Sequence, residues 1–401
     1  MSGANYAEIA DLEAFDAWAP DQGRPKWAAL VDGLSLEALQ REVVGPELHR
    51  KCVERVQAVQ HVLRGDPGSR QAGRFVGKDE IIDMVCACAV AQVPMVLLGP
   101  PGTAKSLIVR SFCDCLGIRE TTRPIAEEDK LIEALSAEGA DVDAVLKDAL
   151  GSRRSRRLFE YLLTRYTTPE EILGTVMIHL IVKKSVYFRF TQGMAPRAEV
   201  VFLDEIFKAN SAILNALLSL VNERIFYNMG EAFSVDLLTA YGASNEPPDT
   251  AELGALYDRF PVRVVSDPVP EALVSDLHAR AMEHGMRQCF GGAGAAHRNA
   301  RNGKVASTND FRLLHKVLYT RIADPASDKF REAFELMFRR LRKEYGISDR
   351  SLHPLYKLAH ARALLADRWP TTEDLVVYKF CAQTVETARI LAQEVSETIQ
   401  P

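Results

Sequence analysis

The sequence has no long uninterrupted apolar run and no basic leader. Its longest apolar stretch, residues 84–98, is broken by Gln92 and Pro94 and is shorter than the ~20 residues that a membrane-spanning helix needs. Residues 1–22 are acidic and lack the order of a secretory leader, in which positive charge precedes an apolar segment. These absences predict a cytoplasmic protein that does not use a membrane.

Cysteine is sparse: the chain of 401 residues has seven, an odd number that does not suggest a disulfide framework. Two pairs, Cys86/Cys88 and Cys113/Cys115, have one residue between their members, whereas zinc sites usually have two to four. On a helix, residues two apart point in different directions. We therefore expect these four side chains to be buried, reduced thiols.

An excess of positive charge is also lacking. The formal net charge is −5, so no overall basic field would attract a phosphate backbone, and nucleic-acid binding is not expected. One basic run, Arg153, Arg154, Arg156 and Arg157, is a local exception. It is either a solvated loop or an element that docks a partner.

What the sequence does have is a three-part organisation. Residues 1–70 carry helical patterns and end in Asp66–Ser69, a cluster typical of a linker. Residues 71–267 alternate short apolar strands with helical patterns, which predicts an α/β fold with a mostly parallel sheet. The strand candidates are MVLLG, RLFEYL, AEVVFLD, LLTAYGAS and FPVRVVS. Residues 268–401 are predicted to be helical, and their last helix is expected to open at Thr371.

The segment VPMVLLGPPGTAKSLIVRSF, residues 93–112, is close to a phosphate-binding loop. It follows a strand and opens a helix, so its backbone N–H groups and the helix N-terminus can surround a phosphate. Lys105 would add a positive charge, and Ser106 a hydroxyl for Mg²⁺. The strict pattern requires Gly before the lysine, where this chain has Ala104. A Gly/Pro-rich turn of no function is the alternative.

Two further strands deliver polar side chains to the same sheet edge. The strand AEVVFLD ends in Asp204-Glu205, where Asp204 would hold Mg²⁺ and Glu205 would activate an attacking water. The strand LLTAYGAS is followed by Asn245, whose amide could orient that water. An acidic strand end that meets solvent and a turn asparagine are the alternatives.

Four motifs in this order, GPPGTAKS, VVFLDEI, ASNEPP and ALYDRF, resemble the AAA+ ATPases, and specifically the MoxR family near its RavA branch. Residues 159–174, 213–228 and 347–375 are similar to that branch as well, and the resemblance covers about 73–401. MoxR proteins commonly carry Ala at the position of Ala104. We attribute this to a helix start, where alanine is a good helix former.

The resemblance implies an α/β fold: an AAA+ P-loop NTPase core with a parallel sheet at 71–267, followed by an all-helical lid domain at 268–401. A helical N-terminal extension, residues 1–70, precedes them. Two segments depart from the family pattern: residues 118–157, an insertion, are longer than it permits, and residues 1–70 match nothing in it. Residues 291–304, rich in glycine, are expected to form a mobile loop.

The resemblance also assigns site residues and cofactors, ATP and Mg²⁺. Glu205 is the catalytic Walker B glutamate beside Asp204, and Asn245 is sensor 1. Arg259 is the arginine finger, which reaches the nucleotide of a neighbouring subunit, and Arg350 is sensor 2, which touches the γ-phosphate. The metal ligands are Ser106 and Asp204. The remaining nucleotide contacts are Val76, Gly77, Gly99, Pro100, Pro101, Gly102, Thr103, Ala104, Lys105, Ser106 and Leu107.

Members of the family usually form hexamers and act on a protein partner, often one with a von Willebrand factor A (VWA) domain, in a chaperone-like role. The leading hypothesis is therefore an ATP-driven ring that remodels such a partner. A nucleotide-gated scaffold with incidental turnover is the second hypothesis, and retention of Glu205, Asn245 and Arg259 argues against it. A DNA-directed motor is the third, and salt-sensitive duplex binding would support it.

Two hairpins are also expected from the resemblance, one within residues 168–199 and one within residues 222–238. Such hairpins commonly face the central pore or the client. Lys183, Lys184 and Arg189 in the first could contact an acidic or nucleic-acid partner, or could lie on the wet face of an ordinary amphipathic hairpin.

Overall fold

The computed structural model describes residues 46–64, 75–118, 157–178, 181–182, 185, 187–228, 230–248, 254, 257–290, 305–382 and 384–399. The predictions for residues 119–156 of the insertion, with Arg153, Arg154 and Arg156 of the basic run, for the loop 291–304, and for Lys183 and Lys184 lie outside these residues. The last arginine of the run, Arg157, is described and forms an ion pair with the buried Glu199. Within the described residues, every helix is too short or too polar to traverse a bilayer.

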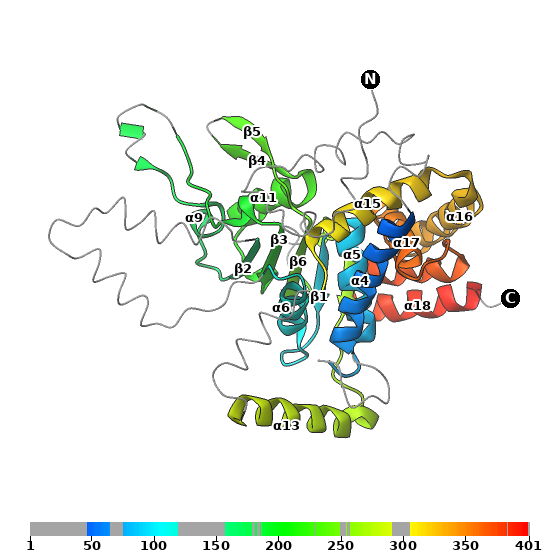
Figure 1. The fold of residues 1–401 in the computed structure, drawn as a ribbon. Helices are drawn as coiled ribbons and strands as arrows, with labels where there is room; N and C mark the ends of the chain where they lie inside the picture. Colours follow the sequence, from blue (N-terminus) through cyan, green and yellow to red (C-terminus); the bar gives the residue numbers. More distant parts are fainter. Residues whose placement is uncertain are drawn as a thin grey trace.

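A five-stranded parallel sheet forms the centre of the core (Figure 1). Its order is β2-β3-β6-β1-β7, and all five strands predicted from the sequence are confirmed. The strands are β1 (Met95–Leu98), β2 (Leu158–Leu162), β3 (Val200–Asp204), β6 (Thr239–Ser244) and β7 (Val262–Val265). Every residue of β1 and β6 is buried, as expected for central strands covered on both faces. Since β1 lies between β6 and β7, the loop after it opens at the carboxyl edge of the sheet between the ends of these two strands.

Short helices connect these strands. Thr168 and Glu171 form a capping box at the start of α9, and Asn210 accepts a hydrogen bond from the Ile213 amide at the start of α11. Helix α5 (Asp79–Ala91) precedes β1. The connecting helices are α6 (Lys105–Cys115), α9 (Pro169–Leu173), η3 (Ala195–Arg197), η4 (Ile206–Lys208), α11 (Ser211–Leu218) and the π-helix η5 (Ser219–Glu223).

The expected hairpin before β6 is present: β4 (Ile225–Asn228) pairs antiparallel with β5 (Glu231–Ser234). Around residues 175–190 the chain also folds back on itself through an antiparallel bridge between Val176 and Arg189. The Asn228 side chain joins the two: its Oδ1 accepts from the Arg189 amide at 2.9 Å and its Nδ2 donates to the Arg189 carbonyl at 3.1 Å. The two hairpins are therefore hydrogen-bonded to each other.

The Arg189 guanidinium contacts groups of its own chain. It donates to Glu170 at 3.1 Å and to the Gly174 carbonyl at 3.0 Å, and it lies 5.6 Å from the centre of the Tyr187 ring. The suggestion that Arg189 serves an acidic or nucleic-acid partner is therefore replaced by a local structural role.

The described residues after β7 are helical, as predicted for 268–401. Helix α13 lies apart from the other helices, and residues 274–279 on it are exposed (Figure 1). The elements are η6 (Glu271–Leu273), α13 (Val274–Phe290), α15 (Thr308–Ala323), η7 (Pro325–Ser327), α16 (Asp328–Tyr345), η8 (Asp349–Ser351), α17 (Leu352–Leu365), η9 (Thr372–Cys381) and α18 (Val385–Ile399).

The single last helix expected from Thr371 onward is wrong in part. The predicted cap exists, since Thr371 and Asp374 form a capping box, but the chain first makes the 3₁₀ helix η9 and then the α-helix α18. Between the two, Ala382 is extended. The Arg263 guanidinium donates to the carbonyls of Cys381 and Ala382, which are therefore not free to continue a helical ladder.

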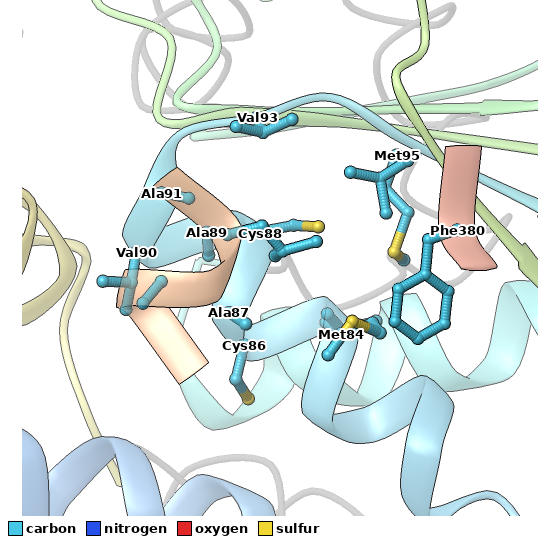
Figure 2. Close-up of a cluster of buried hydrophobic side chains, with 14 of the residues drawn as sticks. Met84, Cys86, Ala87, Cys88, Ala89, Val90, Ala91, Val93, Met95 and Phe380 are labelled. Atoms are coloured by element: carbon cyan, nitrogen blue, oxygen red, sulfur yellow. The ribbon is translucent and has the colours of Figure 1, made fainter. Parts of the chain in front are cut away.

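Helices from both ends of the described chain form one layer beside the sheet. The N-terminal helix α4 (Pro46–Arg64) packs on α15, and α5 packs on α17 and α15. In Figure 2, Phe380 of η9 lies beside Met84 of α5 and Met95 of β1 in one cluster of buried side chains. The apolar face of α5 is thus covered by residues that occur almost three hundred positions later in the chain.

The cysteines of the two Cys-x-Cys motifs, Cys86, Cys88, Cys113 and Cys115, are buried thiols without a disulfide bond, which confirms the sequence prediction. Burial raises the pKa of Cys86 and Cys88 well above the usual thiol value. Both lie on α5 in the cluster of Figure 2, where they act as small apolar side chains.

His360 on α17 is fully buried, and neither ring nitrogen has a hydrogen-bond partner among the described residues. Its ring lies 4.6 Å from the Tyr356 ring centre and 5.6 Å from that of Phe330. Burial lowers the pKa of His360 to about 4, Arg321 adds to this effect, and Asp374 opposes it. The imidazole is therefore neutral in the folded protein at pH 7.

This histidine should make the fold acid-sensitive. Because the unfolded chain takes up the proton near pH 6.5 and the folded chain only near pH 4, the stabilisation is complete above pH 6.5 and is lost as the pH falls toward 4. Between pH 7 and pH 5 this group should cost about 2 kcal/mol of unfolding free energy. In urea titrations at both pH values, His360→Leu should lose about that much less than the wild type. An equal loss in the two proteins would contradict the assignment.

Candidate functional site

The loop Gly99–Ala104 leaves the end of β1 and leads into α6. Gly99 has φ 146°, and a Cβ there would meet the Ser266 carbonyl oxygen at 2.4 Å, so no side chain fits. Gly102 has φ 82° with open space around it, so its backbone conformation is what favours glycine. Pro100, Pro101 and Gly102 are exposed, as is Leu107 on α6. The predicted loop therefore has room for a ligand above it.

Ala104 adopts φ 66° and ψ 18° as the residue that precedes α6. The reason expected from the sequence, helix propensity at a helix start, is wrong because this residue is in the left-handed region and not in the helix. A Cβ costs roughly 1–2 kcal/mol in this conformation. The position thus favours glycine, as the strict pattern requires. The chain tolerates the strain of Ala104, whose methyl group packs against the core.

Lys105 is buried and folded back over the loop. Its Nζ donates to the carbonyls of Gly99 at 2.6 Å and Pro100 at 3.0 Å, and to Asn245 Oδ1 at 3.0 Å. Burial lowers the pKa of Lys105, while Asp204 and Glu205 act in the opposite direction. All three bonded acceptors are neutral oxygens, so an anion placed above the loop would be a stronger partner for this ammonium than its present ones.

Ser106 and Asp204 meet at the carboxyl edge of the sheet. Ser106 Oγ donates to Asp204 Oδ2 at 2.6 Å, although the residues come from α6 and β3. A hydroxyl and a carboxylate are the hard oxygen ligands that Mg²⁺ prefers. The donor set therefore fits the metal site that the sequence predicted.

Glu205 and Asn245 also meet here. Asn245 Nδ2 donates to Glu205 Oε1 at 2.6 Å, while Asn245 Oδ1 accepts from Lys105. Glu205 follows β3 in a left-handed conformation, φ 54°, and its Oε2 lies 3.3 Å from Lys208 Nζ. Sequence analysis did not identify Lys208, and only its spacing of three from Glu205 hinted at the contact.

A second lysine missed by sequence analysis, Lys78, supports the loop from behind. It is buried, and its Nζ donates to the Asp267 carbonyl and, at 3.4 Å, to Ser266 Oγ. Ser266 Oγ in turn donates to the Thr103 carbonyl at 3.0 Å. Burial lowers the pKa of Lys78, Asp267 opposes this effect, and Lys105 adds to it.

Two of the predicted nucleotide contacts, Val76 and Gly77, lie next to Lys78. Val76 is buried, and Gly77 has φ 63° with the side chains of Leu273 and Pro270 at 3.3 and 3.4 Å from where a Cβ would be. Residues 76–77 therefore form an apolar wall with the segment that follows β7. Because Lys78 holds that segment against the phosphate loop, the wall and the loop are joined.

Arg259 and Arg350 lie away from this cluster. Arg259 precedes the start of β7, whereas the loop follows the end of the adjacent strand β1, so the two are at opposite edges of a parallel pair. Asp258 accepts from Arg350 Nη1 at 3.2 Å and from Ser348 Oγ at 3.1 Å. No described residue accepts a hydrogen bond from the Arg259 guanidinium or forms an ion pair with it. Asp258 thus pairs with Arg350 and not with its neighbour Arg259.

Arg263 fixes the segment that carries Arg259. Its buried guanidinium donates to the carbonyls of Tyr257 at 2.9 Å and Phe260 at 3.1 Å and lies 4.0 Å from the Tyr257 ring centre. The Tyr257 ring also meets Phe207 of η4 edge-on, with centroids 5.5 Å apart. A cavity of about 100 Å³ lies beside this segment, between Asp258, Arg263 and the start of α18. The backbone segment that carries Arg259 is therefore held rigidly by Arg263 and Tyr257.

Comparisons with known proteins fit this geometry. A family model described as the MoxR domain in the MoxR-vWA-beta-propeller ternary systems matches residues 66–123 and 124–289, more than half of the chain. The crystal structure of a "putative ATPase" from Cytophaga hutchinsonii superimposes with a TM-score of 0.57 over 91% of this chain and 99% of that one. At 15% identity, this match supports the fold alone.

Curated relatives cover only part of the chain. Two uncharacterized proteins of Methanocaldococcus jannaschii are each 37% identical over 191 residues, 48% of this chain and 40% or 41% of theirs. A structural protein of Acidianus two-tailed virus is 27% identical over 267 residues, 65% of this chain and 36% of its own. The chain thus spans well under half the length of these relatives.

Proposed function

The chain belongs to the MoxR family of AAA+ ATPases, and from this we propose that it binds ATP with Mg²⁺ and hydrolyses it as an assembly that remodels a protein partner. Its placement near the RavA branch stays a prediction. The single observation that carries the proposal is the hydrogen-bonded group Lys105–Asn245–Glu205 next to Ser106–Asp204. The ends of two strands, β3 and β6, and the start of one helix, α6, bring these residues to one edge of the sheet, directly beside the glycine loop that follows β1.

The residues have distinct roles in this proposal. Lys105 exchanges its carbonyl partners for phosphate oxygens, and the loop amides and α6 N-terminus add their own attraction. Ser106 and Asp204 would hold Mg²⁺, which supplies positive charge against the phosphate oxygens. Glu205 accepts a proton from the attacking water, and Asn245 orients both Glu205 and that water.

Assembly is part of the proposal because Arg259 and Arg350 are remote from the loop of their own chain. Phosphoryl transfer gains from a guanidinium beside the spreading negative charge. Arg259 has no partner among the described residues, so it is available to a nucleotide held by a second copy. Arg350 would reach the same neighbour once its pair with Asp258 opens. In a hexameric ring, every nucleotide site would receive Arg259 and Arg350 from a neighbouring subunit.

The proposed partner is a VWA-domain protein. The support is the description of the matching family, which places such MoxR domains in systems with a VWA and a β-propeller component. The hairpins joined by Asn228 project from the core and are the surface we assign to partner contact (Figure 1). The committed bonds of Arg189 and the net charge of −5 make a DNA-directed motor the weaker alternative.

The test is the rate of ATP hydrolysis per subunit as a function of protein concentration, with Glu205→Gln as the blank. If neighbouring copies complete one another, the rate should rise with concentration and reach a plateau as assembly completes, because each active site needs a second chain. The assembly should be followed in parallel by light scattering. A rate per subunit that is constant over a range in which the assembly dissociates would contradict the shared site. ATP binding without hydrolysis, with or without a VWA partner, would instead favour a nucleotide-gated scaffold.

A further inference from the structure

Both carboxylate oxygens of Glu205 have partners within the chain. Oε1 accepts from Asn245 at 2.6 Å, and Oε2 lies 3.3 Å from the Lys208 ammonium. The Glu205 side chain is 16% exposed, so little solvent competes for either oxygen. Each carboxylate oxygen has two lone pairs, so these contacts leave acceptor capacity but fix the direction in which the carboxylate points. A general base must also be aimed at the proton that it removes, so this orientation is part of its function.

The two restraints on Glu205 differ in what can release them. Asn245 is also bonded to Lys105, so a phosphate that draws Lys105 away changes the bonding of Asn245 as well. Lys208 has no such link to the loop. Its side chain is 57% exposed on η4, and its ion-pair partner is Glu205. Nucleotide binding therefore acts directly on one restraint and leaves the other in place.

The local backbone holds Lys208 next to Glu205. The left-handed Glu205 starts the turn, and the Lys208 amide donates to the Glu205 carbonyl at 2.9 Å. Ile206 is fully buried, with its side chain against Gly242 of β6, so the 3₁₀ turn is fixed to the sheet. Only the end of the Lys208 side chain is free to leave, and its departure requires no change in the backbone.

We propose that Lys208 is a positioning residue that holds the Glu205 carboxylate in a resting orientation, and that its release is a condition for hydrolysis separate from ATP binding. The inference rests on the proposed function, since it assigns Glu205 as the base. It predicts that removal of the ammonium accelerates turnover. Because the pair is partly exposed and exposed ion pairs are weak, the acceleration should be roughly two- to fivefold.

The first experiment compares steady-state ATP hydrolysis at saturating ATP and Mg²⁺ for the wild type, Lys208→Ala and Lys208→Arg. Lys208→Ala should raise kcat about two- to fivefold and change the Kd for ATP less than twofold, because the loop is untouched. Lys208→Arg keeps the cation and should stay near the wild type. Arg331→Ala is the matched control: it breaks another i,i+3 ion pair, Arg331–Asp328, on the exposed face of helix α16. A kcat of Lys208→Ala at or below the wild-type value, with an unchanged Tm, would overturn the inference.

The second experiment does not depend on hydrolysis. A water-soluble carbodiimide joins an amine to a carboxylate only when the two are in contact, with loss of one water. In nucleotide-free full-length protein it should link Lys208 to Glu205, and the peptide that contains both should lose the mass of water and resist trypsin after Lys208. Absence of that link would overturn the restraint. If the link forms but the wild type never hydrolyses ATP, the proposed function fails while the restraint stands.

Discussion

Replacing Arg259 with Ala should lower the rate of ATP hydrolysis per subunit about 10³-fold while the Kd for ATP stays within a few-fold of the wild type. An arginine that completes the phosphoryl-transfer site from a second chain contributes on the order of 10³ or more to the rate. The phosphate loop at the other edge of the sheet should bind nucleotide as before, because no described contact joins Arg259 to it. Turnover and equilibrium binding measured on the same preparation check both parts.

A mixing experiment separates a shared site from a damaged fold. Arg259→Ala supplies an intact Glu205, and Glu205→Gln supplies an intact Arg259, so mixed assemblies should recover a share of the activity that neither variant has alone. Arg339→Ala, an exposed arginine on α16, is the control and should behave as the wild type. If mixed assemblies form and no activity returns, Arg259 does not act on a neighbouring chain.

Replacing Glu205 with Gln should lower kcat about 10²- to 10⁴-fold, the range that a positioned general base contributes. The amide keeps the shape of the side chain and can still accept from Asn245, so the loop and its affinity for ATP should be preserved. Single-turnover hydrolysis and equilibrium nucleotide binding measure the two effects. The variant should therefore trap the nucleotide without consuming it.

Glu246→Gln is the matched control for this variant. Glu246 lies next to Asn245, its side chain is exposed, and it takes no part in the network around Lys105. Its turnover should equal that of the wild type. If Glu205→Gln keeps more than a tenth of the wild-type rate, a different group accepts the proton and the role assigned to Glu205 is wrong.

The sequence was sufficient for the parts of this protein in which a short segment determines its own conformation. The five strands are short apolar runs bounded by turn residues, and the phosphate loop and the Asp204-Glu205 strand end are contiguous motifs. Contacts between distant segments could not be derived in this way. The bonds of Lys78 to Ser266 and of Asp258 to Arg350 depend on how β7 and the helical layer pack. The sequence around these residues does not indicate either bond.

Two local predictions failed for reasons that only backbone geometry reveals. Helix propensity predicts that Ala104 belongs to the start of a helix, whereas its φ of 66° places it outside the helix. The sequence pattern predicts that the final helix continues through Ala382, because periodicity does not reveal that Arg263 donates to the carbonyls of Cys381 and Ala382. In both cases the missing information was the conformation or the partner of a single peptide unit.

The layer beside the sheet also has a consequence for how the protein is made. Its helices α4 and α5 are synthesised before the elements that cover them, α15, α17 and η9. Domains generally fold as units during synthesis. Here the apolar face of α5 stays uncovered until η9 has been translated almost three hundred residues later, so the nascent polypeptide exposes an apolar surface over that length of elongation.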